Sequence, residues 1–376
     1  MKFNVLQYLP QNTKIRVNER LRKELFYKKT VTEWSKTLKV HFKNMSRYMN
    51  GKRPIPIKVL IELINFKKIN INSLQNEIEI KIDKGGKYLK IGPFIEINEQ
   101  WVYVSELING DGHITPDFWC ICFINNNKIL IRYVKNFFLS LGIKLPQMYL
   151  VKRDDANFLT IRSSLLAHIL NKILDVAVGK KNEINIPEFI ISDKNLSIAA
   201  VRGAFDAEGS VTFTGSRRIS ISSNSRQWVL QLKRILESLR ISSTIIEEKS
   251  KREKPIYRLL IYSKTNLVRF RDTIRPLHSK RIKKLNEIIN NYTRNPSRWL
   301  HKKVLLSIKN GNERKRDIAK NLNQKLVITG SNINWLKKKE YIEPYQKIYT
   351  NKGSFHKYKL TQQGEEYLNK SLSFFD

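Results

Sequence analysis

The sequence predicts an α+β protein built on two related units, each of helix, two strands, helix, two strands and helix (αββαββα), flanked by small mostly helical domains. Two observations support this prediction: an internal repeat in the middle of the 376-residue chain, and alternating apolar and polar residues at the strand positions of each copy. We therefore expect four regions, at residues 1–90, 98–192, 193–292 and 300–376. The pair Asn295-Pro296 marks a break before the last region, because the residue before proline is pushed out of helical space.

The internal repeat relates the two middle regions. Residues 104–112 (VSELINGDG) align with residues 201–209 (VRGAFDAEG), and each copy ends on an acidic residue and a glycine that strand-like sequence follows. Two further pairs of segments match downstream, 137–143 with 235–241 and 159–163 with 259–263. Residues 218–222 alternate, as strands of a sheet with one solvent-exposed face do. Two such units imply a pseudo-twofold pair with the sheets side by side, a shape suited to a near-symmetric duplex.

The charge balance indicates a polyanionic partner. Lys and Arg number 70 against 33 Asp and Glu, so the formal net charge is +37. An AT-rich genome raises the lysine content, but this excess is spread along the whole chain and is far beyond what solubility requires. Nucleic acid is favoured over a membrane surface, because no long basic amphipathic face stands out.

Composition also excludes several classes of protein. A hydrophobic content of 41% argues against disorder, and no run approaches the ~18 apolar residues of a membrane span. The N-terminus lacks an apolar segment followed by a small-residue cleavage site, so we do not expect secretion. The two cysteines, Cys120 and Cys122, exclude a disulfide scaffold and a four-thiolate zinc site. They suit a reducing compartment, so the expected location is cytoplasmic, as in a prokaryote, or organellar.

The repeated motif resembles that of the LAGLIDADG homing endonucleases, in their single-chain form with two motifs. The second copy, residues 202–211, is a close match, and the first copy, residues 106–114, is looser but keeps the terminal acidic residue and glycine. The first copy departs from the family at Glu106, where a small residue is usual. Over residues 98–290, the resemblance implies two pseudo-twofold repeats with saddle-shaped antiparallel sheets, and a monomer that acts as a pseudo-dimer.

Asp111 and Glu208 occupy equivalent positions at the end of the two motifs. Hydrolysis of a phosphodiester needs a divalent cation, and hard cations prefer oxygen ligands. A purely structural role is poorly motivated, because an acidic residue at a helix C-terminus opposes the helix dipole. The resemblance implies that both acids bind Mg²⁺ or Mn²⁺, helped by the main chain of Gly110 and Ala207. The small residues Gly203 and Ala207 would let the two motif helices approach closely.

The family often carries a basic residue near the end of the second strand of each repeat. The alignment places Asn126 and Asn224 there, with the basic residues Lys128 and Arg226 two positions further on. Either the alignment slips, or these nearby basic residues substitute, or the site is weakened. Residues of the second repeat that we expect to contact DNA are Thr212, Thr214, Arg217, Arg218, Ser220, Ser222, Tyr257, Arg258 and Lys264.

Both flanking regions resemble DNA-binding modules. Residues 31–66 resemble a helix-turn-helix, in which Lys43, Asn44 and Arg47 carry side chains that read bases or phosphates. The alternative is an ordinary small helical hairpin. Residues 302–370 resemble a winged helix-turn-helix, a fold that also serves protein contacts. Its candidate reading helix carries Asn332, Asn334 and Lys337.

The leading hypothesis is a metal-dependent, site-specific endonuclease of double-stranded DNA. The resemblance implies a role in the homing of its own intron or intervening sequence. One alternative is a catalytically weakened DNA-binding regulator of LAGLIDADG descent, and another is an RNA maturase that assists intron splicing. The presence of both acids favours the endonuclease over the DNA-binding regulator, because a protein that only binds DNA has no need of them. Double-stranded DNA is the expected partner, with RNA as the alternative, and no membrane partner is expected.

Overall fold

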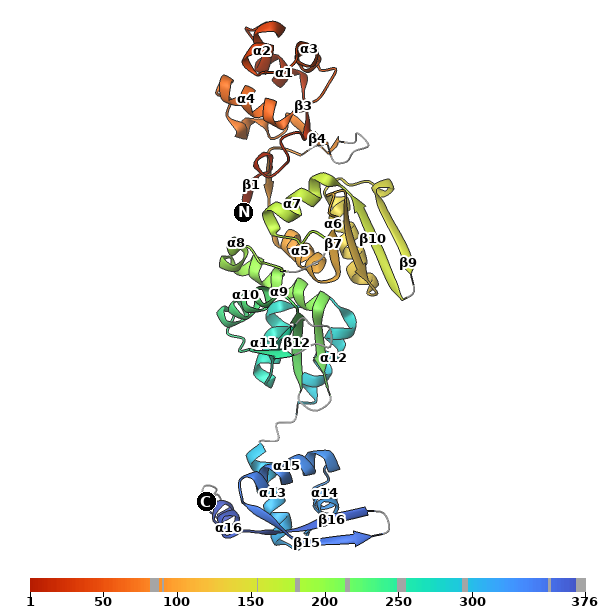
Figure 1. Ribbon diagram of the computed structural model, residues 1–376, viewed down its shortest axis with the longest axis vertical. Coiled ribbons are helices and arrows are strands. Elements are labelled where there is room, and N and C mark those ends of the chain that lie inside the picture. The colour runs from red at the N-terminus through yellow and green to blue at the C-terminus, as the bar shows by residue number, and fades with distance from the viewer. Residues whose placement is uncertain are drawn as a thin grey trace. The chain divides into compact units, whose positions relative to one another are not determined.

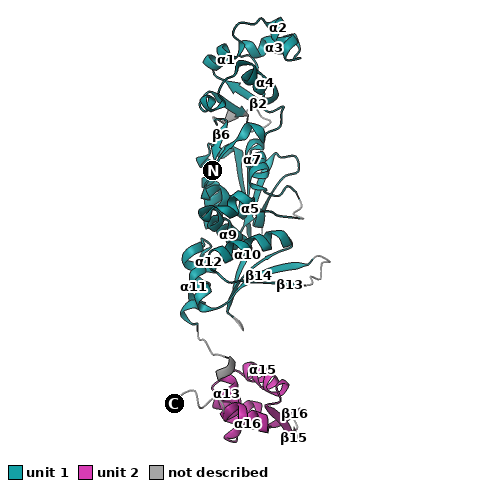
Figure 2. Cartoon of the chain, turned by 90° about the vertical axis from the view of Figure 1, so that its left-hand side faces the viewer, with its two compact units in different colours: residues 1–292 teal, residues 293–376 magenta. Residues whose placement is uncertain are grey.

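The computed structural model describes residues 1–81, 88–89, 91–153, 155–179, 183–213, 217–248, 255–292, 297–350 and 353–369. The chain divides into two compact units, unit 1 (residues 1–292) and unit 2 (residues 293–376) (Figure 2). The predicted break at Asn295-Pro296 lies outside the described residues. Across the described ranges, no helix is both long enough and apolar enough to cross a membrane.

Unit 1 contains two repeats with the same order of elements (Figure 1). The first repeat consists of α5 (Glu99–Asp111), β7 (Gly112–Ile114), β8 (Cys120–Asn125), α6 (Lys128–Ser140), β9 (Met148–Arg153), β10 (Ala156–Arg162) and α7 (Ser164–Leu174). The second consists of α9 (Lys194–Glu208), β11 (Gly209–Thr212), β12 (Arg218–Ser223), α10 (Arg226–Ser238), β13 (Thr244–Glu248), β14 (Ile256–Ile261) and α11 (Lys264–Ile274), and α12 (Ser279–Asn290) follows it. Each repeat forms a four-stranded antiparallel sheet, with the orders β7-β8-β10-β9 and β11-β12-β14-β13. The predicted α+β class with two αββαββα units is confirmed.

The two motif helices, α5 and α9, begin at matching caps and pack against each other. Asn98 and Asp193 each accept hydrogen bonds from two backbone N–H groups of the first turn, which fixes where each helix starts. The crossing is close because of its glycines: a Cβ on Gly110 would lie 2.3 Å from the Cβ of Ala207. A Cβ on Gly203 would lie 2.7 Å from the Cβ of Glu106, so any side chain at these two positions would push the helices apart.

Glu106 is fully buried at this crossing, although a small residue is usual there in the family. Its carboxylate accepts hydrogen bonds from Trp228 Nε1 at 2.7 Å and from Asn109 Nδ2 at 3.2 Å. Trp228 belongs to α10 of the second repeat, so this bond links the two repeats. Gly203 leaves room for the extra side chain, which explains how the first motif tolerates a glutamate.

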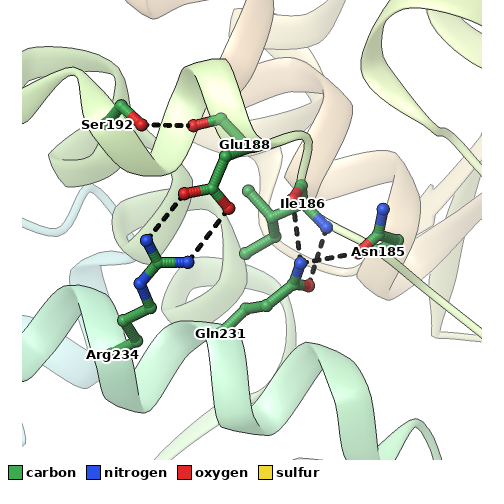
Figure 3. A network of polar contacts seen from close by, with 6 residues as sticks. All are labelled: Asn185, Ile186, Glu188, Ser192, Gln231 and Arg234. Atoms are coloured by element: carbon green, nitrogen blue, oxygen red, sulfur yellow. Dashed lines mark hydrogen bonds and ion pairs between the residues drawn. The ribbon is translucent and has the colours of Figure 1, made fainter.

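The segment that leads into the second repeat is fixed to α10 by side-chain bonds (Figure 3). Arg234 donates to both carboxylate oxygens of Glu188, at 3.0 and 2.6 Å, and Glu188 begins the short helix α8 (Glu188–Ser192). Gln231 donates to Ile186 O at 2.9 Å and accepts from Ile186 N at 2.9 Å. These bonds hold the linker as an extended arm along the repeat that it precedes.

The first region contains a small sheet as well as helices. Its elements are β1 (Lys2–Asn4), β2 (Lys14–Val17), α1 (Glu19–Phe26), α2 (Val31–Thr37), α3 (Phe42–Met49), β3 (Ile55–Pro56), α4 (Ile57–Lys67), β4 (Ile78–Lys81), β5 (Tyr88–Leu89) and β6 (Phe94–Glu96). The strands pair in the order β3-β2-β4-β5, with β1 on β6. The helical character predicted for residues 1–90 is therefore only part of the fold. Pairs such as Ile15 with Ile80 join distant segments, which local sequence patterns do not reveal.

Unit 2 has its own hydrophobic core. It consists of α13 (Ser297–Lys309), α14 (Lys315–Asn321), α15 (Leu326–Lys338), β15 (Ile342–Thr350), β16 (Gly353–Leu360) and α16 (Gln362–Asn369). Leu305, Ile318 and Leu336, from the three helices α13 to α15, are fully buried together. Strands β15 and β16 form an antiparallel hairpin. Three helices followed by a hairpin is the element order of a winged helix-turn-helix.

Candidate functional site

The two candidate acids lie at matching ends of the paired helices. Asp111 is the last residue of α5 and Glu208 is the last residue of α9, and a strand starts directly after each. A Cβ on Gly110 would lie 3.2 Å from Glu208 Cγ, so the end of α5 adjoins the Glu208 side chain. Asp111 is half-buried and Glu208 is exposed. The close helix crossing therefore brings both acids to one place at the junction of the two repeats.

Asn125, at the end of β8, positions the Asp111 carboxylate. Its Nδ2 donates to Asp111 Oδ2 at 2.7 Å, and its Oδ1 accepts from Asn127 N at 2.7 Å. The sequence alignment pointed to Asn126, one residue further along, which is exposed. The residue that contacts the candidate acid is therefore Asn125, one position before the residue that the alignment gave.

The other supporting residues lie at the surface near the ends of the second strands. Lys128 is the first residue of α6 and Arg226 is the first residue of α10, and both are exposed. Asn224 follows β12 and lines a cleft of about 300 Å³ together with Glu208, Asn109 and Trp228. The structure therefore brings Asn224 to the same cleft as one of the acids.

Arg281, on α12, contacts the C-terminal end of α9 directly. Its guanidinium donates to Phe205 O at 2.7 Å and to Ala207 O at 2.8 Å, and it also donates to Asp206 O. Burial lowers the pKa of Arg281, whereas the nearby carboxylates of Asp206 and, after it, Asp111 and Glu208 act in the opposite direction. Arginine keeps its charge in proteins, so a fixed positive charge lies beside both acids.

Asp206 sets the position of the helix that carries Arg281. This fully buried carboxylate accepts hydrogen bonds from Leu277 N at 2.8 Å and His278 N at 3.1 Å, at the start of α12. It also accepts from Tyr103 OH of the first repeat at 2.9 Å. Burial raises the pKa of Asp206, and these three bonds work against that rise. Sequence reasoning missed both Asp206 and Arg281, because their contacts join segments far apart in the chain.

The donor set partly fits a divalent cation. Two carboxylates from two helices supply the oxygen ligands that hard cations prefer. The backbone carbonyl of Ala207, which the family resemblance assigns to the metal, already accepts a hydrogen bond from Arg281. Over the described residues, no group of three or more His, Cys, Asp or Glu side chains could hold a metal ion. The two acids are therefore suitable ligands for a divalent cation, whereas Ala207 O already accepts a hydrogen bond from the Arg281 guanidinium.

The second sheet presents a polar face. Thr212 pairs with Arg218, and Ser222 pairs with Arg258, so these four side chains point to the same side. Arg258 forms an ion pair with Glu248 at 3.0 Å. Ser220 shares the face, but it is 6% exposed, and its hydroxyl lies 2.8 Å from that of Ser210.

The remaining residues expected to contact DNA in this repeat lie elsewhere. Tyr257 pairs with Ser223 on the opposite side of the sheet and packs against the hydrophobic core, so its assignment to the polar face is corrected. Arg217 precedes β12 and stacks over Phe213, and Lys264 is the exposed first residue of α11. Thr214 lies outside the described residues.

The corresponding face of the first sheet mixes apolar and polar side chains, and it includes Arg162, which donates to the Tyr149 hydroxyl at 2.8 Å. His113, Cys122 and Thr160 lie side by side across β7, β8 and β10, and Phe158 opposite Val151 continues the same face. Cys122 is half-buried, and burial raises the pKa of its thiol. It therefore packs as a small apolar side chain. The two repeats thus share a fold but present different surfaces.

In the first region, α3 presents Lys43 and Arg47 to solvent. Asn44 is half-buried and accepts a hydrogen bond from Arg53 Nη1 at 2.6 Å. Its amide is therefore held by a neighbouring side chain, and the two cations form the open face of this helix.

In unit 2, α15 presents Asn334 and Lys337 to solvent, whereas Asn332 faces inward. Asn332 is only 9% exposed, and its Nδ2 donates to Ile328 O at 2.7 Å. The expectation that Asn332 reads bases is corrected: its side chain is bonded to its own helix. The start of α15 is apolar and open, with Val327 78% exposed.

Parts of this chain are similar to a family model and to solved structures. Residues 195–275 match a family model described as a LAGLIDADG-like domain. No curated protein sequence matches the chain. The structure of I-DmoI in complex with DNA and Mn is similar with a TM-score of 0.37 and 20% identity, over 47% of this chain and 96% of that one. Full-length DUF199/WhiA from Thermatoga maritima is similar with a TM-score of 0.38 and 14% identity, over 65% and 93% of the two chains.

Proposed function

We propose that this protein is a site-specific endonuclease that cleaves double-stranded DNA with Mg²⁺ or Mn²⁺, in the manner of the LAGLIDADG homing endonucleases. The observation that carries the proposal is the placement of Asp111 and Glu208 at matching ends of the paired helices α5 and α9. The LAGLIDADG-like match over residues 195–275 and the net charge of +37 support it. Its biological role would be the homing of its own intron or intervening sequence.

When bound, the divalent cation would activate water and screen the charge that develops on the phosphodiester. Asp111 and Glu208 would hold it, with the backbone carbonyls of Gly110 and Ala207 as further oxygen ligands. Asn125 orients the Asp111 carboxylate through its 2.7 Å hydrogen bond, so this acid is fixed before DNA arrives. The cation therefore needs little rearrangement at the α5 end of the site.

The polar face of the second sheet would contact the duplex. Arg218 and Arg258 supply donors for phosphates and guanines, and Thr212 and Ser222 supply hydroxyls that suit either bases or phosphates. Contacts by Lys43 and Arg47 on α3 would add phosphate neutralisation outside this central region.

A second candidate is a DNA-binding regulator that does not cleave. The observation that favours it is the hydrogen bond from Arg281 to Ala207 O, because a guanidinium at that carbonyl competes with a cation. In this case Asp111, Glu208 and Arg281 would form a structural charge cluster at the junction of the repeats.

The two candidates are separated by a selection followed by a cleavage assay. Full-length protein first selects duplexes from a random-sequence library in EDTA, and the selected duplex is then incubated with Mg²⁺ or Mn²⁺. We expect cleavage by the wild type, and none by Asp111→Asn or Glu208→Gln, because each change removes a metal ligand and leaves the DNA contacts in place. Affinity for the duplex should remain within about threefold of the wild type, since neither acid is a DNA contact.

Glu237→Gln is the matched control, because Glu237 is an exposed acid on α10 that pairs with Lys233 away from the helix crossing. It should cleave like the wild type. Cleavage at the wild-type rate by either acid variant would overturn the catalytic assignment. Tight binding by the wild type without cleavage in either metal would establish the regulator instead.

A further inference from the structure

Arg281 is the one guanidinium that the described hydrogen bonds place on three successive carbonyls at the end of α9. It is half-buried and comes from α12, a helix outside the repeated motif. Its position is fixed at both ends: the carbonyls of α9 hold the guanidinium, and Asp206 holds the first turn of α12. A side chain so constrained has a defined role at this location.

Asp206 O and Ala207 O belong to the last turn of α9, where helix geometry leaves carbonyls without intrahelical partners, whereas Phe205 O also accepts a hydrogen bond from Gly209 N. One of them, Ala207 O, directly precedes Glu208, so a cation bound by the Glu208 carboxylate and this carbonyl would lie within a few ångströms of the guanidinium. Two positive charges at such a distance in a half-buried site repel each other strongly. The hydrogen bond from Arg281 and a metal ion at Ala207 O are therefore competing arrangements.

We infer that Arg281 is a built-in cation that competes with the divalent metal for the end of α9 and raises the metal concentration that the site requires. The inference rests on the proposed function only in taking Asp111 and Glu208 as metal ligands. Without metal, the guanidinium satisfies the carbonyls and offsets part of the negative charge of Asp206, Asp111 and Glu208, so the helix pair stays intact. With metal, repulsion between the two cations would drive Arg281 off Ala207 O. Arg281 is thus a positioning residue whose positive charge lowers the affinity of the site for the metal.

The test measures Mn²⁺ binding to the full-length protein without DNA, from the electron paramagnetic resonance signal of free Mn²⁺. Arg281→Gln keeps an amide donor for the carbonyls but removes the charge. We expect it to bind Mn²⁺ at least about tenfold more tightly than the wild type. Arg281→Lys keeps the charge and should stay within about threefold of the wild type. Lys284→Gln, an exposed cation on the same helix, is the matched control and should change nothing.

The gain in Arg281→Gln must depend on the acids, so the double variant Arg281→Gln/Glu208→Gln should lose it. Unchanged Mn²⁺ affinity in a folded Arg281→Gln protein would overturn the inference, and so would an equal gain in Arg281→Lys. If Arg281→Gln does not fold, the wild type itself gives the answer by nitrogen-15 NMR of arginine side chains. Hindered rotation of the Arg281 guanidinium, assigned with Arg281→Lys, should disappear as Mg²⁺ saturates the site, and its persistence at saturation would contradict the competition.

These measurements involve neither DNA nor cleavage, so they are independent of the endonuclease assay. A tighter Arg281→Gln variant combined with an inactive wild type would uphold the competition and overturn the endonuclease. An active wild type with no effect of Arg281→Gln would do the reverse.

Discussion

A few buried polar side chains connect the two repeats residue by residue. Glu106 of the first repeat bonds to Trp228 of the second, and Asp206 of the second bonds to Tyr103 of the first. A buried polar group without its partner costs about 1–3 kcal/mol, so each of these bonds favours one relative position of the repeats over others. The acids at the helix ends are held in place by this arrangement and do not depend on loops.

His278, at the start of α12, makes stability depend on pH. Its side chain is 7% exposed, and burial, with the nearby positive charge of Arg281 as a smaller cause, lowers its pKa to about 4. Protonation is therefore easier in the unfolded chain, where the pKa is about 6.5. The contribution to stability is fully present above pH 6.5 and is lost as the pH falls toward 4. We expect the free energy of unfolding to drop by about 1–3 kcal/mol over this range.

Urea titrations at several pH values measure this drop, and His278→Gln is the comparison because a glutamine does not titrate. The variant should lose markedly less stability between pH 6.5 and 4 than the wild type. An identical decline in both proteins would show that His278 is solvated in the folded state.

At the same scale, the sequence predicted the two acids but not their surroundings. Asp111 and Glu208 could be found because the motif repeats and each acid precedes a glycine. Asn125 was missed by one position, since only the strand register distinguishes it from Asn126. Arg281 could not be found, because it reaches α9 from a helix outside the repeat and no local pattern encodes that contact.

Among the elements, the close crossing of α5 and α9 depends on the small side-chain volume at Gly110 and Ala207. A methyl group on Gly110 would lie 2.3 Å from the methyl of Ala207, well inside contact distance. We expect Gly110→Ala to lower the free energy of unfolding by about 1–3 kcal/mol, as overpacking does. Adding Ala207→Gly moves the methyl from one helix to the other, so the double variant should recover most of this loss.

Urea unfolding of the four proteins in this cycle measures the coupling. Ala207→Gly alone is the control, since it removes a methyl group without relieving a clash. Additive effects of the two changes would mean that the helices separate here at little cost, and that the close crossing does not determine where the acids lie.

The elements that sequence patterns predicted best are the long, strongly patterned ones. The alternation of residues 218–222 indicated β12. Strands β2, β3 and β5 of the first region were missed because they have two to four residues and pair across long loops. The sequence did not reveal that Asn332 faces inward, because helix periodicity groups residues on one side but does not say which side is buried.

On the scale of the whole molecule, the net charge and the separate core of unit 2 raise the question of how much unit 2 contributes to DNA affinity. The net charge of +37 belongs to the whole chain, and unit 2 has a core of its own. If unit 2 binds DNA, deleting residues 293–376 should weaken binding to a long duplex much more than binding to a short core duplex. For every phosphate that unit 2 neutralises, the deletion should make the slope of log K against log salt shallower by about 0.9. Cleavage at saturating protein should change little, because Asp111 and Glu208 are untouched.

Fluorescence anisotropy on both duplexes between about 50 and 200 mM salt measures the affinities and the salt slopes. Over this range, six neutralised phosphates cost about three decades in affinity. Circular dichroism of the truncated chain checks that unit 1 keeps its fold. Equal affinities and slopes for the full and truncated proteins would assign unit 2, with its open apolar residues such as Val327, to a protein partner.

The unlike faces of the two sheets have a consequence for recognition. A symmetric dimer must present one surface twice, which restricts it to palindromes. Here Arg218 and Arg258 lie on the polar face of the second sheet, whereas Phe158 and Val151 lie on the equivalent face of the first sheet. A duplex turned end for end would meet the wrong half of the protein at both positions. If the chain binds DNA as proposed, its target therefore need not be an inverted repeat, and its binding has a direction along the DNA.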